Sequence, residues 1–512
     1  MKSIAKDTND WYKPKRYVHI GLPLRMKDKS NVISKIKDKN FIAHYAFLPL
    51  IHRRHVSYKR TALGGRKRKT KLKVRHICFA SHFDAQIYSY YANLLGTRYE
   101  KWLESNSLSS NVVAYRSIPT EDGKSHKGHI HFAKEVFDDI ITKSNNGDVG
   151  VIIADISGFF DNLDHNLLRS VWMEILDCKV LPPDHMNVYR NATHFSYIDE
   201  NIFFKDFLKK KVLCRTKSGK IVTKKIDKLK YFRRNNVVAF CERSRMSDLR
   251  RSGLIETGDF KYKGRAILCK DGKKDRKGIP QGLPISAVLA NLYMTKFDLS
   301  LASWCNDYSA LYRRYSDDIA IVLPYEHINE AKQFLFSEIR NVKLEIQESK
   351  TDTYRFYRND DRLECSLSID EKTEKKSRLN YLGLNFDGEH ILLKDKSIAK
   401  YYSKMQKAVA SSERYALSIQ NSSRGRLFVD RLLRRFSLAG SYPKFPHQNE
   451  KGTTTKRKFG NYLTYSRRAA IICESPQIIN QLSKNLHIVT TLIRKAENNI
   501  QNKLNPIDSQ SE

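Results

Sequence analysis

The feature that most constrains this chain is the run VGVIIADI at residues 149–156. Its apolar residues are nearly continuous and mostly β-branched, a pattern typical of a strand that is buried on both faces. The run also contains a carboxylate, Asp155, at the point where the buried strand ends.

Two adjacent aspartates in RYSDDIAIV, Asp317 and Asp318, lie between two short apolar runs that can pair as a hairpin. Held in a tight turn, their carboxylates repel each other unless protons or cations neutralise them. The chain has two other such pairs. Residues 138 and 139 lie in an amphipathic helix pattern, and residues 360 and 361 lie in a polar turn, so neither pair requires a special role.

A carboxylate at the end of an adjacent strand would complete a metal site, and Asp155 is the candidate. Hard divalent cations such as magnesium prefer carboxylate oxygens, and two ions held by three carboxylates can catalyse nucleotidyl transfer. The alternative is three unrelated surface acids. Because Asp is common in turns, these residues alone give the two interpretations similar weight.

The charge balance indicates a polyanionic partner. The 512 residues include 93 Lys and Arg against 55 Asp and Glu, a net charge of +38 at pH 7, which favours nucleic acid over a ribosomal or membrane-surface role. Residues 205–276 hold 24 basic and 8 acidic residues with weak periodicity, so we interpret them as a basic insertion. Lys209, Lys210 and Lys211 within it are candidate RNA-binding residues.

Membrane and disulfide signals are absent from the sequence. No stretch approaches the length of a membrane span, and the first residues lack the apolar segment of a signal peptide. We therefore expect a cytoplasmic protein without a membrane partner. The eight cysteines are scattered, with no Cys-x-x-Cys pair or zinc-like spacing, which predicts reduced thiols in or near the core.

Helix and strand patterns alternate along the chain and predict an α+β fold. Helical patterns cover residues 81–103, 166–176, 287–302 and 328–339, and short strands are expected at 342–346 and 379–386. The alternation from Lys71 to Arg75 suits a strand with its cations on one face, with a solvated basic loop as the alternative. After about residue 398 the pattern becomes helical and basic.

Five segments resemble, in order, the palm motifs of reverse transcriptases. They are ADISGFFDNLDH (154–165), GIPQGLPISAVLANLYM (278–294), RYSDDIAIV (314–322), LEIQESKT (344–351) and NYLGLNF (380–386). They are most similar to the bacterial members, which include group II intron enzymes, retrons, and the abortive-infection and defence-associated (unknown-group) branch. The resemblance implies a right-hand polymerase with fingers, a ferredoxin-like palm and a helical thumb, plus a basic insertion in the palm and a helical C-terminal extension.

This resemblance divides the chain into six parts. They are an N-terminal basic extension (1–70), fingers (71–150), the first part of the palm (151–204), the basic insertion (205–276), the second part of the palm (277–390), and the helical thumb with its C-terminal extension (391–512).

The resemblance also assigns roles to individual residues. Asp155, Asp317 and Asp318 match the catalytic aspartates that bind two magnesium ions, or manganese in their place, with the backbone carbonyl of Ile156 as a further ligand. Phe160 matches the aromatic steric gate that excludes a ribose 2′-hydroxyl. The other nucleotide-binding candidates are Lys73, Arg75 and Arg116 at the triphosphate, Gln281 and Gly282 beside the nucleotide and the templating base, and Lys350 as a proton donor to pyrophosphate. For Lys350, a solvated strand-end lysine is an equal alternative.

The implied activity is RNA-directed DNA synthesis from deoxynucleoside triphosphates, in bacterial antiviral (anti-phage) defence. The implied partners are an RNA template, a co-encoded non-coding RNA, the DNA product, and a homo-oligomer or a second protein subunit. Template-independent and protein-primed DNA synthesis are alternatives within the same fold. An RNA-dependent RNA polymerase is disfavoured because it usually has a second Asp where this chain has Phe160, and the retained carboxylates disfavour an inactive RNA-binding scaffold.

Three departures from the family pattern matter. The 162 residues between Asp155 and Asp317 exceed what a compact palm requires, and the basic insertion accounts for the excess. The retron Val-Thr-Gly is absent, since the nearest segment reads HIVTT (487–491), which disfavours a retron. After residue 400 the sequence supplies no carboxylate cluster for a nuclease, which disfavours a mobile-element enzyme.

Overall fold

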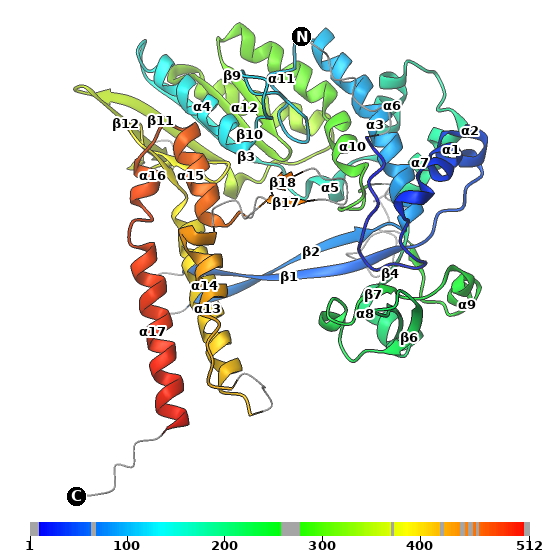
Figure 1. The fold of residues 1–512 in the computed structure, drawn as a ribbon. Helices are drawn as coiled ribbons and strands as arrows, with labels where there is room; N and C mark the ends of the chain where they lie inside the picture. The colour runs from blue at the N-terminus through cyan, green and yellow to red at the C-terminus, as the bar shows by residue number, and fades with distance from the viewer. Residues whose placement is uncertain are drawn as a thin grey trace, which may run out of the picture.

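The computed structural model describes residues 10–62, 68–257, 277–369, 373–419, 424–440, 446–448, 454–456 and 460–505. At its centre is a six-stranded antiparallel sheet in the order β13-β12-β11-β3-β10-β9 (Figure 1). The strands are β3 (Val149–Asp155), β9 (Leu311–Tyr315), β10 (Asp318–Pro324), β11 (Asp352–Asn359), β12 (Arg362–Ser368) and β13 (Glu374–Lys376).

Four of these strands follow a βαββαβ path along the chain. Helices separate β3 from the hairpin β9–β10, and α12 (Ile328–Asn341) separates β10 from β11. In space the four strands lie in the order β11-β3-β10-β9, so the first strand is central and pairs with the third and the fourth. Mixed helices and antiparallel strands of this kind make the fold α+β, as the sequence predicts.

Helices cover both faces of this sheet because β3 and β10 are apolar on both faces. Ile152, Ala154 and Ile321 belong to one core, with α3 (His82–Ser105), α6 (His165–Leu176), α7 (Pro183–Thr193), α10 (Ser286–Tyr293) and α11 (Thr295–Asp307). Val151 and Ile153 belong to the other core, with α4 (His129–Lys143) and the C-terminal helices. The strand predicted to be buried on both faces is therefore central and double-sided.

The C-terminal helices and a small second sheet form an arm below the main sheet (Figure 1). The sheet contains β14 (Leu379–Tyr381), β15 (Leu384–Phe386) and β16 (Ile391–Leu393). The helices are α13 (Asp395–Ala416), α14 (Val429–Phe436), α15 (Tyr462–Ile472), α16 (Gln477–Asn480) and α17 (Asn485–Leu504), and β17 (Pro446–Gln448) pairs with β18 (Thr454–Lys456).

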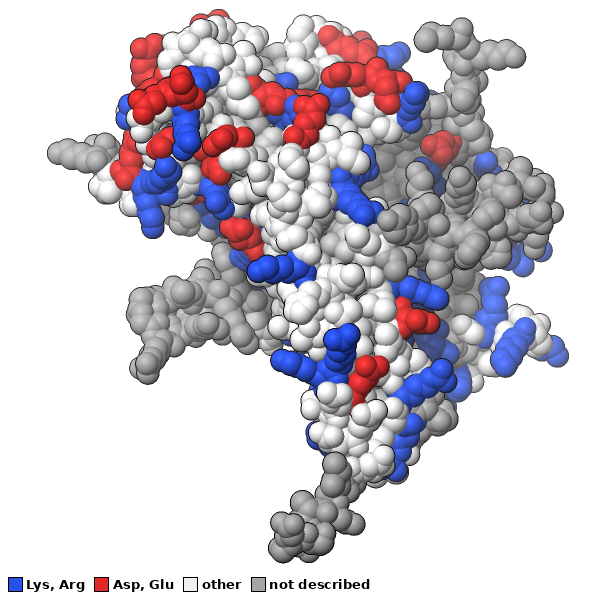
Figure 2. All heavy atoms as spheres, turned by 60° about the vertical axis from the view of Figure 1, so that its left-hand side comes forward, with Lys and Arg blue, Asp and Glu red and all other residues white. Residues whose placement is uncertain are grey.

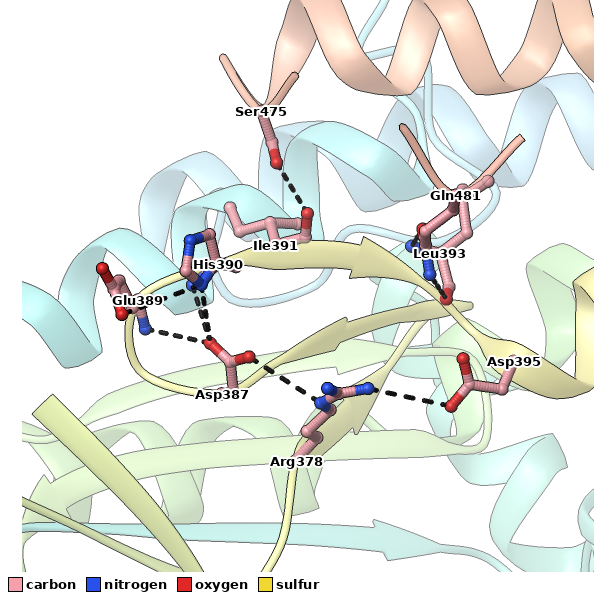
Figure 3. A network of polar contacts seen from close by, with 9 residues as sticks. All are labelled: Arg378, Asp387, Glu389, His390, Ile391, Leu393, Asp395, Ser475 and Gln481. Atoms are coloured by element: carbon pink, nitrogen blue, oxygen red, sulfur yellow. Dashed lines mark hydrogen bonds and ion pairs between the residues drawn. The ribbon is translucent and has the colours of Figure 1, made fainter. Parts of the chain in front are cut away.

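The segment around α16 closes the open edge of β16 (Figure 3). Gln481 Nε2 donates to the Leu393 carbonyl (3.2 Å), its Oε1 accepts from the Leu393 N–H (2.8 Å), and Ser475 Oγ donates to the Ile391 carbonyl (2.7 Å). Arg378 bridges Asp387 and Asp395 at the same junction, at 3.7 and 4.0 Å. Because these side chains satisfy backbone groups that a bare edge would expose, the C-terminal helices are built into the fold.

A long ribbon of two antiparallel strands projects from the opposite side of the molecule (Figure 1). It consists of β1 (Leu50–Ala62) and β2 (Arg68–Phe79), and its sheet continues with β4 (Ser196–Asp199) and β8 (Glu256–Thr257). The strand predicted around Lys71 to Arg75 is therefore present. The predicted domain boundary at residues 70 and 71, however, falls inside one hairpin, because β1 and β2 pair along their whole length.

The described part of the basic insertion, residues 205–257, has its own small sheet. Its strands are β5 (Lys211–Arg215), β6 (Ile221–Lys225) and β7 (Val237–Ala239), in the order β6-β5-β7, flanked by α8 (Glu200–Ile202) and α9 (Met246–Arg251). Phe203, Phe204 and Phe240 form its core together with Ile20 and Ile51 from the N-terminal part of the chain. The rest of the insertion, 258–276, lies outside the described residues.

One local strand prediction is wrong. Residues 342–346 form no strand; Ile346 makes only an isolated bridge to Ile156. This segment follows the end of α12 and packs Val342 and Leu344 into the core, so its alternating apolar residues reflect burial alone.

Charge is unevenly distributed on the face that carries the C-terminal helices. Figure 2 shows Asp and Glu mainly at its upper end, whereas Lys and Arg dominate along the helical arm below. No helix in the described ranges is long and apolar enough to cross a membrane. The seven cysteines within those ranges are free thiols.

Candidate active site

The structure places two of the three predicted aspartates directly opposite each other. Asp155, the last residue of β3, is the antiparallel partner of Asp318, the first residue of β10. Paired residues in a sheet point to the same face, and two residues further along each strand Ile153 and Ala320 lie in the α4 core. The two carboxylates therefore lie on the α4 face, just beyond the end of its apolar core.

The third aspartate lies in the turn that joins β9 to β10. Tyr315 pairs with Asp318, so Ser316 and Asp317 form a two-residue loop, and the φ of Ser316 is +63°. The Asp317 carbonyl accepts a hydrogen bond from the Ile156 N–H at 3.0 Å. This contact fixes the turn against the end of β3, and it puts Ile156, the predicted backbone ligand, beside the aspartates.

Burial and mutual repulsion make this carboxylate cluster unfavourable when fully ionised. Burial raises the pKa of Asp318 to about 7, and repulsion by Asp317 and Asp155 adds to the rise. Burial also raises the pKa of Asp317, again with a contribution from Asp155. A bound cation would relieve both costs.

A lysine already neutralises part of this charge. The Lys350 ammonium forms a short ion pair with Asp155 Oδ2, and the Gln347 N–H donates to the Asp155 carbonyl at 3.0 Å. Lys350 was predicted from the motif at residues 344–351, with a solvated lysine as the alternative. Its position against a candidate catalytic carboxylate favours the first interpretation.

The donor atoms fit magnesium in type and location. Carboxylate oxygens are the ligands that this ion prefers, and the three aspartates lie around one strand end. Among the described residues, however, no three His, Cys, Asp or Glu side chains converge as a ready ligand set. Lys350 explains part of this difference, because its contact with Asp155 has to open before all three carboxylates can bind the same ions.

The loop predicted to flank the nucleotide is joined to the segment after β3. The Ile279 N–H donates to the Phe160 carbonyl and the Gly278 N–H to the Leu163 carbonyl, both at 2.8 Å. The side chain of Phe160 is partly buried and packs on the core. Gly278 has a φ of +88°, and a Cβ there would lie 2.8 Å from the Asp161 carbonyl oxygen, so a side chain would separate the two segments.

The same loop continues onto the ribbon. Gln281 bridges Ile77 of β2, and the Cys78 N–H donates to the Gln281 carbonyl at 2.8 Å. Gly282 has a φ of +113°, and a Cβ at this position would lie 2.6 Å from the Cys78 carbonyl oxygen. Glycine is therefore required here, and the loop aligns β2 with the end of β3.

The ribbon brings two predicted cations to the site. Lys73 and Arg75 lie on one face of β2, and both are exposed. Burial, with repulsion by Arg75 and Lys350, lowers the pKa of Lys73, while attraction by Asp155 and Asp317 opposes that shift. Lys73 is thus within electrostatic reach of the carboxylates.

Arg116, in contrast, is engaged elsewhere. Its guanidinium pairs with Glu100 at 2.6 Å and donates to the carbonyls of Ser109 and Val112, both at 2.6 Å, with a side chain only 6% exposed. These bonds fix the loop that follows α3. These partners engage Arg116 in the structure, and its role at a triphosphate stays a prediction.

Beneath the aspartates lies a buried ion pair that the sequence analysis missed. Arg314 of β9 and Asp298 of α11 are both fully buried and form two hydrogen bonds, of 2.7 and 2.6 Å. Arg314 Nη1 also donates to the carbonyl of Ser316 at 3.2 Å, and Tyr312 donates to Asp298 at 2.6 Å. This network fixes the residue that precedes Asp317.

A second contact on the same turn was also missed. The hydroxyls of Tyr115 and Ser316 lie 3.1 Å apart, and both residues have left-handed backbones, with φ of +62° and +63°. The Tyr115 side chain is otherwise exposed. Strained backbone of this kind is concentrated at functional sites, but nothing local in the sequence predicts contact between residues 201 positions apart.

A cavity of about 350 Å³ opens beside Asp318. His129, Tyr315, Asn380 and Lys394 contribute polar side chains to its wall, and Lys394 Nζ donates to Asn380 Oδ1 at 2.8 Å. Lys394 lowers the pKa of Asp318 against the larger effects of burial and of the other aspartates. It is a further cation at the site that no motif predicts.

Lys209, Lys210 and Lys211 lie apart from these residues, in the turn that enters β5. Lys209 and Lys210 have φ of +48° and +63°. Their role in RNA binding stays a prediction.

Comparison with known proteins finds similarity over part of this chain. Residues 255–386 match the family model described as "Reverse transcriptase (RNA-dependent DNA polymerase)". The retron Ec86 reverse transcriptase of Escherichia coli is 35% identical over 74 residues, which are 14% of this chain and 23% of that protein. The chain thus spans less than a quarter of the length of this curated relative. The missing Val-Thr-Gly disfavours a retron, so a similarity to a retron enzyme runs against that expectation.

Solved telomerase structures give weaker matches. The apo telomerase of Candida tropicalis, truncated from its C-terminal domain, has a TM-score of 0.32 at 11% identity over 71% of this chain and 60% of that chain. The Candida albicans telomerase, in complex with a TWJ fragment of telomeric RNA, has a TM-score of 0.35 at 12% identity over 91% and 65%. Likeness at this level does not bear on function.

Proposed function

We propose that this protein is an RNA-directed DNA polymerase. The observation that carries the proposal is the placement of Asp318 opposite Asp155, with Asp317 in the adjoining turn, inside a chain whose residues 255–386 match reverse transcriptases. In this proposal the fingers (71–150) would include most of β2 with α3 and α4, the palm (151–204 and 277–390) would be built on the six-stranded sheet, and the thumb with its C-terminal extension (391–512) would contain the helices α13–α17.

Asp155, Asp317 and Asp318 would hold two magnesium ions. Ions held by these residues would supply activation of the primer hydroxyl and neutralisation of the charge on the leaving pyrophosphate. The hydrogen bond from the Ile156 N–H to the Asp317 carbonyl and the Arg314 bond to the Ser316 carbonyl hold the turn against the end of β3, which supports this assignment.

Cations of this chain would bind the triphosphate. Lys73 of the ribbon is attracted by Asp155 and Asp317, and Arg75 lies beside Lys73 on the same face of β2. Lys350, once released from Asp155, would hold a proton at Nζ that it can give to the leaving group. Gln281 and Gly282 support the base pair from the loop against β2. The ring of Phe160 would stand beside C2′ of the incoming sugar and exclude a hydroxyl.

The aspartate assignment is tested by Asp317→Asn together with Asp318→Asn. We expect detectable deoxynucleotide incorporation on a primed RNA template to disappear, because the ion-binding charge is lost. Asp360→Asn with Asp361→Asn is the matched control, since it also neutralises two adjacent aspartates at a hairpin turn. Undiminished incorporation by the first variant would refute the site.

The sugar preference is tested by Phe160→Ala. Incorporation efficiencies for matched deoxy- and ribonucleotides should differ strongly in the native enzyme and move towards equality in the variant, because the exclusion is steric. A native preference for ribonucleotides, or an unchanged ratio, would contradict the gate.

The biological setting rests on the resemblance of the palm motifs. We place the enzyme in bacterial antiviral defence with a bound non-coding RNA, for which the net charge of +38 is suited. Sequencing the RNA and DNA that copurify with the protein from its own cells tests this assignment.

A further inference from the structure

A cavity of about 660 Å³ lies between the basic insertion and the base of the ribbon. It exists because the N-terminal segment adds to the insertion sheet: His19 bridges Ala239 of β7, and the Phe240 N–H donates to the His19 carbonyl at 2.9 Å. His19 is fully buried, and its Nε2 lies 3.0 Å from the Phe79 carbonyl of β2. The insertion is thereby attached to the ribbon.

Arginines from three separate parts of the chain meet at this cavity. Arg16 comes from the N-terminal segment, Arg53 from β1, and Arg215 and Arg233 from the insertion, with Glu200 as the one acid in the lining. Arg53 is paired with Glu200, at 2.5 and 2.6 Å. The other three form no ion pair within the described part of the chain, so three guanidinium groups remain for an anionic ligand.

Two aromatic side chains complete the lining. Tyr17 and Phe232 are both partly buried. Tyr17 is fixed by a hydrogen bond from its hydroxyl to the Ala80 carbonyl (2.7 Å) and stacks on His82, and Phe232 packs against Phe204 and Phe240. Arginine forks bind phosphate and aromatic rings stack on bases, so this combination matches a nucleotide strand better than a simple anion.

The ribbon connects the cavity to the cations near the aspartates. Arg53 lies on the same face of the ribbon as Arg75 and Lys73, because His55 pairs with Arg75 and Ser57 with Lys73. Four residues of strand separate Arg53 from Ser57, or about 13 Å at a rise of about 3.3 Å per residue. One basic face thus leads from the cavity to the candidate active site.

We propose that this cavity binds the unpaired part of the RNA template ahead of the active site. Arg16, Arg215 and Arg233 hold its phosphates, and Tyr17 and Phe232 contact a base. The proposal rests on the proposed function for the identity of the strand, and it gives the basic insertion a role as a template-entry subsite.

The test compares two primed RNA templates, one blunt and one with an unpaired 5′ extension of ten nucleotides, in a binding assay without nucleotide or divalent metal. The native protein should bind the extended template at least tenfold more tightly. Arg16→Gln with Arg215→Gln and Arg233→Gln should abolish that gain, and the salt dependence of binding should weaken by about two units of logarithmic slope, since each phosphate contact to a single strand contributes about 0.7.

Lys27→Gln with Lys35→Gln and Lys37→Gln is the matched control, because it removes three exposed charges from the region of α1 (Lys29–Lys37), away from the cavity lining. It should keep the gain. An equal gain in the arginine variant, or no gain in the native protein, would overturn the subsite. Since the assay needs no catalysis, either result is independent of the aspartate test, and failure of that test leaves this one interpretable.

A crosslinking experiment locates the unpaired RNA directly. 4-Thiouridine in the unpaired extension should crosslink to peptides that contain Tyr17 or Phe232. Crosslinks confined to the C-terminal helices would overturn the proposal and assign the unpaired RNA to the basic surface of that arm.

Discussion

Two hairpins of the same sheet, β9–β10 and β11–β12, offer a controlled comparison. Each turns through a two-residue loop whose first residue is left-handed, Ser316 at φ +63° and Asp360 at φ +52°, and each carries two adjacent aspartates. Asp360 and Asp361 are exposed at a free end. Asp317 and Asp318 face the end of β3, and Asp155 lies opposite.

The difference between the hairpins lies in their surroundings. The β9–β10 turn is held by Arg314, Tyr115 and Ile156, which come from a strand, a loop and a neighbouring strand end. Burial then raises the carboxylate pKa values in this turn. Two adjacent aspartates form a candidate ion site where a third carboxylate, here Asp155, lies on the strand opposite them. The Asp-Asp sequence by itself does not distinguish the two hairpins.

The largest expected difference is in the stability that one ion pair gives to each hairpin, Arg314–Asp298 at β9–β10 and Arg355–Asp148 at β11–β12. Asp298→Asn leaves the fully buried Arg314 without its counter-charge, so the free energy of unfolding should fall by about 3–5 kcal/mol. Asp148→Asn breaks the pair between Asp148 and Arg355 of β11, whose side chains are 36% and 38% exposed, and should cost about 0–1 kcal/mol.

Urea unfolding of both variants measures this difference. Polymerase activity under conditions where the Asp298→Asn variant remains folded should also be reduced, because the Ser316 carbonyl loses its fixed donor. Similar losses of stability in the two variants would mean that the buried pair has no special part in holding the turn.

A smaller change in the free energy of unfolding, this time an increase, is expected when an aspartate of the β9–β10 turn is neutralised. The pKa of Asp318 is about 7 in the folded chain and about 3.9 for an unperturbed Asp, so between these values the folded state binds more protons. The free energy of unfolding of the metal-free protein should therefore fall as pH rises through about 7. Asp318→Asn should weaken this dependence, of which Asp317 with its raised pKa keeps a part, and should stabilise the metal-free protein by about 1–3 kcal/mol at pH 8.

Denaturation in a chelator between pH 5 and pH 8 checks this prediction, with Asp361→Asn as the control that should change stability by less than about 0.5 kcal/mol. If the Asp318 variant is no more stable than the native chain at pH 8, the carboxylates are not strained as their surroundings indicate.

The smallest effect, a loss in kcat, is expected when a single tyrosine hydroxyl is removed. Tyr115→Phe removes the contact with Ser316, and one such hydrogen bond contributes about 1 kcal/mol, which corresponds to about a fivefold loss in kcat. The KM for deoxynucleotides should stay constant, because Tyr115 acts through the turn. Tyr357→Phe, which removes a hydroxyl bonded to Glu364 beside the other hairpin, should leave both constants unchanged.

A rise in KM with an unchanged kcat would instead make Tyr115 a nucleotide contact. That outcome would transfer its role from the turn to the binding of substrate.

The sequence predicts the parts of this site that local patterns encode. A double-sided apolar run predicts β3, and two apolar runs around an Asp pair predict β9–β10. The ion pair of Arg116 with Glu100 could not be foreseen, because Glu100 lies on a helix that no motif includes. Asp298 and Tyr115 were missed for a similar physical reason: their contacts with the catalytic turn form only when the chain is folded, and their own segments read as ordinary helix and loop.

The core on the α4 face of the sheet joins residues as far apart as Ile130 and Ile500. During synthesis at about 5–20 residues per second, about 20–70 s pass between the emergence of these two residues. Over that interval α4 can cover part of this face of β3, but the contribution of the C-terminal helices to the core is still missing. Among the described residues, the cavity beside Asp318 has no lining residue beyond Lys394, so its walls can form before α17, which supplies only core residues such as Val489 and Ile500, has emerged.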